Sequence, residues 1–236
     1  MNRIIVESAF WELFPEAEIQ ILVVKAIDNH VVEAKNDYFA ALLADGANDA
    51  GQYLTDANFS QNRVVAEWRE AFSKFKTKKG ARASIEALLK RASQGHEFRP
   101  INPLVDIYNS VSLQFAVPCG GEDIDTIEGD LRLGKAQGRE SFLPLGADAD
   151  APALPGEIIY YDDAGAICRC LNWREAQRTM LTEDTVNAVL VIEAINREQA
   201  MRAREAAAKM KQLLDGYFNV ESVTYQLSVE NPEIVL

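Results

Sequence analysis

The segment Pro118-Cys119-Gly120-Gly121 is well suited to close contact with a ligand. Paired glycines let the backbone approach a ligand, and their N–H groups can stabilise the oxyanion that forms when an ester is attacked. An ordinary tight turn is the alternative, because Gly-Gly is a common loop signal. Cys119 could act as a nucleophile in principle, but no histidine lies near it in the sequence.

A second group of candidate residues, Asn172-Trp173-Arg174-Glu175, follows the end of a predicted strand. Trp173 could stack on adenine or on an amino-acid side chain, and a buried tryptophan with its indole N–H satisfied is the alternative. Arg174, like Arg169 and Arg178, could contact phosphates, with surface salt bridges as the alternative. We therefore treat this segment as a candidate binding site.

Asp106 and Asn109 are three residues apart, which places them on one face of a predicted helix. Both side chains could point toward a pocket. Asp106 could instead complement the positive end of the helix dipole, since it lies in the first turn.

Basic residues are concentrated in one part of an acidic chain. The net charge is −12, yet residues 61–105 carry 10 basic and 4 acidic side chains. A solvated helix face explains such a charge run, and a local patch that contacts phosphates is the other explanation. The best candidates for an RNA track in this segment are Lys74, Lys76, Lys78, Lys79 and Arg82.

Several classes of protein are excluded by composition and motifs. No Gly-x-Ser-x-Gly elbow exists, and His30 and His96 are far apart, so a serine–histidine hydrolase is not indicated. Three cysteines, two of them at Cys168 and Cys170, match neither a disulfide framework nor a zinc pattern. No apolar run could span a bilayer, and no signal peptide is visible. We expect a cytoplasmic protein with reduced thiols, no metal and no cofactor.

Apolar spacing and turn residues predict alternating helices and strands. Asn102 is expected to cap a helix that begins at Pro103, since proline at the first helical position loses no useful N–H. Gly46 and Gly216 are each expected just beyond the end of a helix. The predicted helices are 32–44, 61–75, 83–93, 103–113 and 197–214.

Strands are expected where β-branched residues cluster or alternate. Residues 157–161 and 166–171 flank Asp162-Asp163-Ala164-Gly165, which reads as a hairpin. Residues 186–195 fit a buried strand or a helix, and we favour the strand. The other predicted strands are 18–28, 131–135 and 222–229, and the long loops are 44–60, 114–130 and 144–156. The fold class is α/β (α+β), a mixed sheet with flanking helices.

Five stretches of the sequence together resemble a known family. They are Arg99–Val111, Pro118–Asp123, Gly156–Tyr160, Cys168–Arg174 and Arg178–Thr182. The chain resembles the stand-alone B3/B4 tRNA-editing proteins, which are similar to the editing domain of the phenylalanyl-tRNA synthetase beta subunit. The resemblance covers about residues 60–200. It implies one B3/B4-like domain over 1–236, with the helix and strand of 197–229 packed on it.

The resemblance also implies roles for individual residues. Arg99 matches a rim arginine that contacts the terminal adenosine or a phosphate, and Asn109 matches an asparagine that orients the pocket backbone. Glu175 matches a glutamate that recognises the wrong amino acid. Gly120 stands where the synthetase domain has a histidine, and Trp173-Arg174 replace two glycines, so this chain departs from the family at both places.

The function implied is hydrolysis of a mischarged aminoacyl-tRNA by a water held in a glycine-lined pocket. Gly120, Gly121 and Asn109 would form the reaction site, and Arg99, Asn172, Trp173, Arg174 and Glu175 would bind the substrate. Transfer RNA is the expected partner; membranes and DNA are not expected, and the oligomeric state is open. The alternatives are a tRNA- or RNA-binding module without catalysis and a small-molecule-binding protein that uses the same pocket.

Overall fold

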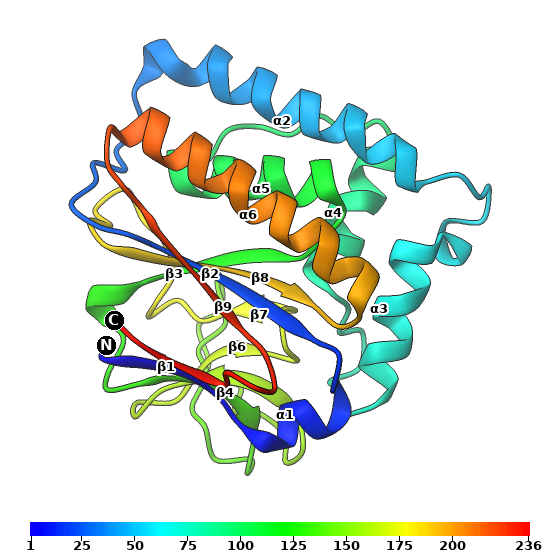
Figure 1. Ribbon diagram of the computed structural model, residues 1–236, viewed down its shortest axis with the longest axis vertical. Coiled ribbons are helices and arrows are strands. Elements are labelled where there is room, and N and C mark those ends of the chain that lie inside the picture. Colours follow the sequence, from blue (N-terminus) through cyan, green and yellow to red (C-terminus); the bar gives the residue numbers. More distant parts are fainter.

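The computed structural model describes residues 1–236 as two β-sheets and a layer of helices (Figure 1). The α-helices are α1 (Ser8–Leu13), α2 (Asn36–Ala50), α3 (Arg63–Ser73), α4 (Ser84–Ser93), α5 (Pro103–Phe115) and α6 (Arg197–Phe218). The strands are β1 (Arg3–Val6), β2 (Glu18–Val24), β3 (Cys119–Asp123), β4 (Leu131–Lys135), β5 (Ile158–Tyr161), β6 (Ala166–Arg169), β7 (Arg174–Glu175), β8 (Ala188–Ala194), β9 (Val223–Leu227) and β10 (Glu233–Val235).

One sheet has four antiparallel strands in the order β3-β8-β2-β9. The helices α5 and α6 cover one of its faces, with α6 directly against β2 and β8, and α2 packs on α5 on the side away from the sheet (Figure 1). The other sheet has six strands in the order β10-β1-β4-β5-β6-β7, and β1 runs parallel to β4 while the remaining pairs are antiparallel. The predicted α+β class with mixed strand directions and flanking helices is confirmed.

Strand alternation divides the interior into two apolar cores. In β2, Ile19, Ile21 and Val23 belong to the core between the two sheets, whereas Leu22 and Val24 belong to the core under the helices. Successive side chains of a strand point to opposite faces, so the four-stranded sheet is covered on both sides. Its strands therefore read as continuous apolar runs, and the prediction of a buried strand over 186–195 is confirmed by β8.

Two glycines that we expected beyond helix ends lie inside helices. Helix α2 continues through Gly46 to Ala50, and α6 continues through Gly216 to Phe218, where Asn219 adopts the left-handed conformation. The expected start of the 44–60 loop is therefore wrong. A Cβ on Gly46 would lie 2.6 Å from the carbonyl oxygen of Ser110, so this glycine permits close packing of α2 on α5.

Pairing between distant segments also creates elements that local patterns did not indicate. β3 lies within the expected loop of 114–130, because pairing with β8 extends the Cys-Gly-Gly segment. β1, α1 and β10 were not predicted; β1 is only four residues long and pairs with β10 at the far end of the chain. Every helix of the chain is either too short or too polar to span a bilayer.

Candidate functional site

A cavity of about 50 Å³ lies between the two sheets and is lined by acidic side chains. Its walls come from β3, β4, β5, β6, β7 and β8, from the segment between β6 and β7, and from the first residue of α4. On this measure one water needs roughly 10–15 Å³, so the cavity has room for a few waters or a small polar group. The lining residues are Ser84, Cys119, Gly120, Gly121, Glu122, Leu131, Tyr160, Cys168, Leu171, Asn172, Glu175, Val191 and Glu193.

Strand register explains why two glutamates of the four-stranded sheet meet here. In β3, Gly120 lies opposite Val191 and Glu122 lies opposite Val189. Both valines belong to the core between the sheets, so Gly120 and Glu122 face that side. Glu193, two residues after Val191 in β8, projects from the same face.

The six-stranded sheet contributes a row of side chains from three adjacent strands. Tyr160 of β5 lies opposite Cys168 of β6, which lies opposite Glu175 of β7. Cross-strand partners project from one face, and all three line the cavity. Glu175 reaches toward β3: a Cβ on Gly120 would lie 3.6 Å from Oε1 of Glu175.

Hydrogen bonds hold the Glu193 carboxyl at one wall of the cavity. The Tyr160 hydroxyl donates to its Oε1 at 3.1 Å, and Nδ2 of Asn172 donates to its Oε2 at 3.4 Å. Oδ1 of Asn172 accepts from the backbone N–H of Ser84 at 3.3 Å. Asn172 therefore links the carboxyl of Glu193 to the start of α4.

Burial raises the pKa of all three glutamates at the cavity. It brings the pKa of Glu175 to about 7. It brings the pKa of Glu193 to about 8, although the hydrogen bonds from Tyr160 and Asn172 oppose that change. Burial and, secondly, the charge of Glu175 place the pKa of Glu122 well above its usual range. A carboxyl whose pKa is near 7 can exchange a proton with water or substrate at neutral pH.

Two buried polar atoms at the cavity have no hydrogen-bond partner in the protein. They are Oε2 of Glu122 and Oγ of Ser84. Buried polar atoms nearly always bond to protein or to ordered water. A water or a polar group of a substrate in the cavity could supply the missing partners.

The segment that contains Gly120 is a strand, and the predicted turn is wrong. The Glu193 N–H donates to the carbonyl oxygen of Pro118 at 3.3 Å. Antiparallel alternation then makes Gly120 and Val191 the next hydrogen-bonded pair. The N–H of Gly120 is thus directed to β8 rather than to a substrate, and Gly120 contributes the space left by its missing side chain.

Gly121 has a different reason to be glycine. A Cβ there would lie 2.4 Å from Cδ2 of Leu190 and 3.2 Å from the carbonyl oxygen of Val189. Leu190 belongs to the core under the helices, so the Cβ direction of Gly121 points away from the acidic cavity, although its backbone lines it.

Arg99 does not line this cavity. It lines a separate hollow of about 330 Å³ with residues of α2 and the first turn of α5, including Asp37 and Asp106. The expectation that Arg99, Gly120 and Glu175 surround one cavity is therefore correct for Gly120 and Glu175 and wrong for Arg99.

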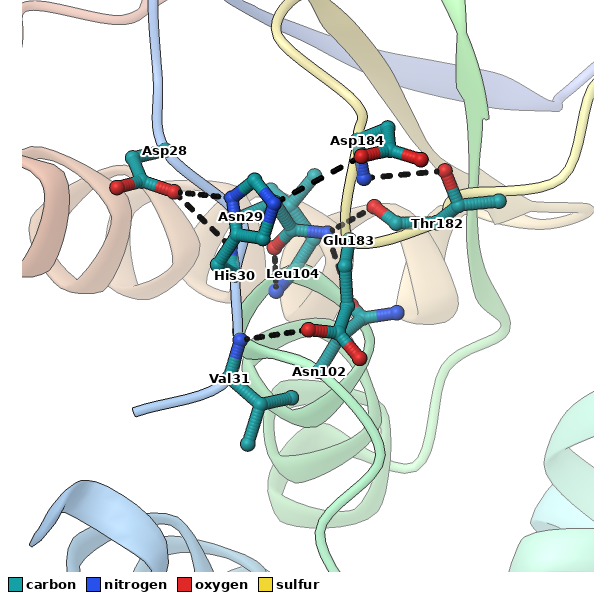
Figure 2. A network of polar contacts seen from close by, with 9 residues as sticks. All are labelled: Asp28, Asn29, His30, Val31, Asn102, Leu104, Thr182, Glu183 and Asp184. Atoms are coloured by element: carbon teal, nitrogen blue, oxygen red, sulfur yellow. Dashed lines mark hydrogen bonds and ion pairs between the residues drawn. The ribbon is translucent and has the colours of Figure 1, made fainter. Parts of the chain in front are cut away.

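The buried side-chain amide of Asn29 fixes the start of α5 (Figure 2). Oδ1 of Asn29 accepts from the N–H of Leu104 at 2.9 Å, and its Nδ2 donates to the carbonyl oxygen of Thr182 at 2.7 Å. Oδ1 of Asn102 accepts from the N–H of Val105 at 3.1 Å, which confirms the predicted N-cap. The network joins the start of α5 to two loops that are distant in the sequence.

Asn109 and Trp173 both lie outside the cavity lining. Asn109 is a half-buried residue of α5, and Trp173 is half-buried against the core between the sheets. The exposed Arg174 guanidinium lies 5.3 Å from the centre of the Trp173 ring. The exposed Arg174 thus lies over the half-buried ring of Trp173, and both residues come directly before Glu175 in the chain.

The two other arginines of this segment are already paired. Arg169 is buried and donates from Nε to Oε2 of Glu157 at 2.8 Å. Arg178 donates two hydrogen bonds to the Asp162 carboxylate, at 2.7 and 2.9 Å. The salt-bridge alternative is correct for both, and phosphate contact by Arg169 is excluded by its burial.

The five basic candidates lie in the segment that connects the end of α3 at Ser73 to the start of α4 at Ser84. All five are exposed. None of the five forms an ion pair. Their charges are therefore available to a partner.

All three thiols are buried and free. Burial raises the pKa of Cys119 and Cys168 well above the usual range and that of Cys170 to about 12, so none is a ready nucleophile. No group of three or more histidine, cysteine, aspartate or glutamate side chains is arranged to hold a metal ion.

Sequence reasoning missed four polar residues of the cavity: Ser84, Glu122, Tyr160 and Glu193. One signal was available, since Glu193 is the single charged residue within the apolar run Ala188–Ala194. A buried charge in a strand requires partners, which makes it a site candidate. The position of Ser84 depends on tertiary packing and gives no such signal.

The comparisons with known proteins concern the same region. A family model for the B3/4 domain matches residues 67–215, which include every residue that lines the cavity. The phenylalanine–tRNA ligase beta subunit of Cutibacterium acnes is 38% identical over 69 residues, or 29% of this chain and 8% of that subunit. That of Psychrobacter arcticus is 32% identical over 106 residues, or 44% of this chain and 12% of that subunit.

These matches span only a small part of each subunit. An N-terminal fragment of the phenylalanyl-tRNA synthetase beta subunit from Pyrococcus horikoshii aligns in structure with a TM-score of 0.49 at 11% identity, over 94% of this chain and 53% of that chain. Because the family model matches more than half of the sequence, the chain belongs to the B3/4 domain family.

Proposed function

We propose that the protein is a deacylase that hydrolyses the ester bond of mischarged aminoacyl-tRNA in trans. The observation that carries the proposal is the meeting of Glu122, Glu175 and Glu193 at one cavity, with the pKa of Glu175 raised to about 7. Family membership and the tRNA ligase relatives support tRNA as the partner.

The reaction needs a water, a base and a place for the ester. A water at the cavity attacks the ester carbonyl carbon while the Glu175 carboxylate accepts one of its protons. The bond from the carbonyl carbon to the ribose oxygen breaks, and the ribose oxygen receives the proton that Glu175 took from the water. The free amino acid leaves, and the Glu175 carboxylate is restored. An aminoacyl ester is already activated, so holding the water in place can supply much of the rate increase.

The size of the cavity limits what enters it. About 50 Å³ holds a water or the tip of a small polar side chain, so the ester and ribose would remain at the mouth. The ester would be held at Gly120 and Glu175, which are both partly exposed. The buried carboxyls favour an amino acid that carries a hydrogen-bond donor.

Other residues would position the RNA. In this proposal Trp173 and Arg174 offer a stacking surface beside the cavity, and Lys74, Lys76, Lys78, Lys79 and Arg82 contact phosphates. Asn172 holds the Glu193 carboxyl in place, and Asn109 and Arg99 would act from α5 and its preceding segment. The protein would work in the cytoplasm without a metal or cofactor.

The test is release of amino acid from a panel of mischarged tRNAs by the purified protein. Glu175→Gln should lose release of the preferred amino acid, and Glu221→Gln, a change at an exposed glutamate away from the cavity, should keep it. Failure of the unmodified protein to release any amino acid at high concentration would reject the proposal.

Binding of tRNA without hydrolysis is the second candidate. The small volume of the cavity favours it, because a complete aminoacyl group does not fit as the residues now lie. Equal affinity for charged and uncharged tRNA, with no deacylation, would identify this function.

A further inference from the structure

A second hollow, of about 400 Å³, lies next to the acidic cavity on the other side of the α4 N-terminus. Trp68 and Phe72 of α3 line it, with Arg69, Arg82, Glu86 and the backbone of Gly80–Ala83. Ala83 lines this hollow and the adjoining Ser84 lines the cavity, so one peptide unit separates the two. A ligand bound in the hollow would therefore reach the neighbourhood of the proposed reaction site.

The indole N–H of Trp68 has no acceptor in the protein. Trp68 is 1% exposed, and its Nε1 is buried without a hydrogen bond. Trp11, by contrast, donates from Nε1 to the carbonyl oxygen of Val6 at 3.1 Å. Buried tryptophan N–H groups normally find an acceptor. Trp68 lines the hollow, so a ligand oxygen that enters beside its ring could complete this N–H once the atoms that now cover Nε1 move aside.

The electrostatics of the hollow favour an anion. The carboxylate of Glu86 is neutralised by two hydrogen bonds from Arg69, at 2.7 and 3.2 Å. Arg82 is exposed, forms no ion pair and remains a free cation of the hollow. The N-cap of α4, Ala83, has no side-chain acceptor of its own, and the N–H of Ser84 bonds to Oδ1 of Asn172 on the side of the acidic cavity. The charge that favours an anion in the hollow is therefore that of Arg82.

The surrounding segment is basic as well. Lys74, Lys76, Lys78 and Lys79 lie between α3 and the Gly80–Ala83 wall, in a chain whose net charge is −12. Such a local concentration of unpaired cations attracts a phosphate backbone while the acidic remainder repels it elsewhere.

We propose that this hollow is a phosphate-binding site that takes a phosphodiester near the 3′ end of an RNA strand, with Trp68 and Arg82 as the residues that bind it. The inference rests on the proposed function for the identity of the RNA, and the phosphate site itself rests on the hollow. Trp68 donates from its indole N–H to a phosphate oxygen, and Arg82 supplies the charge. The strand would then lead from the hollow past the start of α4 to the acidic cavity.

The first test follows the indole N–H resonances of the three tryptophans in ¹⁵N-labelled protein. Titration with a CCA trinucleotide that bears a 5′ phosphate should shift the Trp68 signal, while the Trp11 signal, already hydrogen-bonded, stays fixed. Inorganic phosphate alone should give the same shift at higher concentration. A Trp68 signal that moves with neither ligand would overturn the proposal. A signal that moves only with inorganic phosphate at high concentration, and not with the trinucleotide, would overturn it as well.

The second test uses charge. Arg82→Gln should weaken trinucleotide binding about tenfold and lower the slope of log affinity against log salt by about 0.7, the value for one lost contact to a single strand. Lys25→Gln, at an exposed lysine beyond the end of β2, is the matched control and should change neither. Equal behaviour of the two variants would reject the role of Arg82.

The outcomes separate this inference from the deacylase proposal. Deacylation with an unchanged KM in Arg82→Gln would leave the enzyme proposal standing and reject the phosphate site. A Trp68 shift with the trinucleotide in a protein that releases no amino acid would support the phosphate site and reject the deacylase proposal.

Discussion

The Tyr160 hydroxyl donates a hydrogen bond to Oε1 of Glu193 at 3.1 Å and thereby joins the two sheets. Tyr160 belongs to the six-stranded sheet and Glu193 to the four-stranded sheet, and both line the acidic cavity. The bond thus serves the fold and the site together. It also opposes the effect of burial on the Glu193 pKa, since it favours the charged carboxylate.

Replacement of this tyrosine should weaken the fold. Tyr160→Phe leaves the ring in place but removes one of the two hydrogen bonds to a buried carboxyl, which should lower the free energy of unfolding by about 1–3 kcal/mol. Urea unfolding at pH 7 measures the change. Tyr225→Phe on β9, where the ring is half-buried and its hydroxyl has no partner, should change it by less than about 0.5 kcal/mol. Equal losses in the two variants would contradict the assigned role of the bond.

The raised pKa of Glu193 makes stability depend on pH in a defined direction. The folded protein holds this proton up to a pH of about 8, whereas the unfolded chain releases it near pH 4.3. Between these values the folded state binds more protons, so the free energy of unfolding should fall as the pH rises from 5 to 9. Glu193→Gln should make that fall shallower, and Glu221→Gln should leave it unchanged. A wild-type protein that is most stable at pH 9 would refute this expectation.

Activity should follow the ionisation of Glu175. If its carboxylate is the base, kcat/KM for deacylation should rise with pH and level off above a pKa of about 7. Glu175→Gln should lower kcat/KM by about 10²–10⁴-fold and remove that rise. Each rate is corrected for spontaneous ester hydrolysis at the same pH. A Glu175→Gln profile with the same inflection would assign the pKa to another group.

The two adjacent glycines of β3 should respond differently to alanine. In Gly121→Ala the new Cβ would lie 2.4 Å from Leu190 and 3.2 Å from a backbone oxygen, which should lower the free energy of unfolding by about 1–3 kcal/mol. In Gly120→Ala it would lie at ordinary contact distance from Glu175, so the fold should tolerate it. Deacylation, however, should fall in Gly120→Ala because the methyl group occupies the mouth of the cavity. Thermal unfolding and the release assay distinguish the two effects.

Much of the fold could be predicted because its signals are local. Apolar spacing predicted α3 and α4, and the Asn102-Pro103 start predicted α5. Runs rich in apolar and β-branched residues predicted β2 and β8. The turn predicted at Gly120-Gly121 was wrong, because pairing of β3 with β8 outweighs the turn preference of the two glycines. Neighbouring residues in the sequence do not encode that partner, which lies about 70 positions away.

The residues of the site could be predicted only where they belong to a recognisable local segment of the sequence. Gly120, Asn172 and Glu175 were identified and do meet at one cavity. Glu122 and Glu193 were missed because their approach depends on the register of β3 against β8. We expected Arg99 at the acidic cavity, but it lines the hollow beside α2. Its place in the sequence just before α5 does not determine on which side of that helix its side chain lies.

The helix glycines Gly46 and Gly216 offer a matched test of packing against helix propensity. Alanine is favoured over glycine inside a helix by about 1 kcal/mol, and Gly216 has nothing within 4 Å of a new Cβ, so Gly216→Ala should stabilise the protein by roughly 0.5–1 kcal/mol. In Gly46→Ala the same gain is outweighed, because the methyl group would lie 2.6 Å from the Ser110 carbonyl oxygen and would force α2 away from α5. Urea unfolding should therefore show changes of opposite sign. Stabilisation by both substitutions would mean that α2 does not pack on α5 this closely in solution.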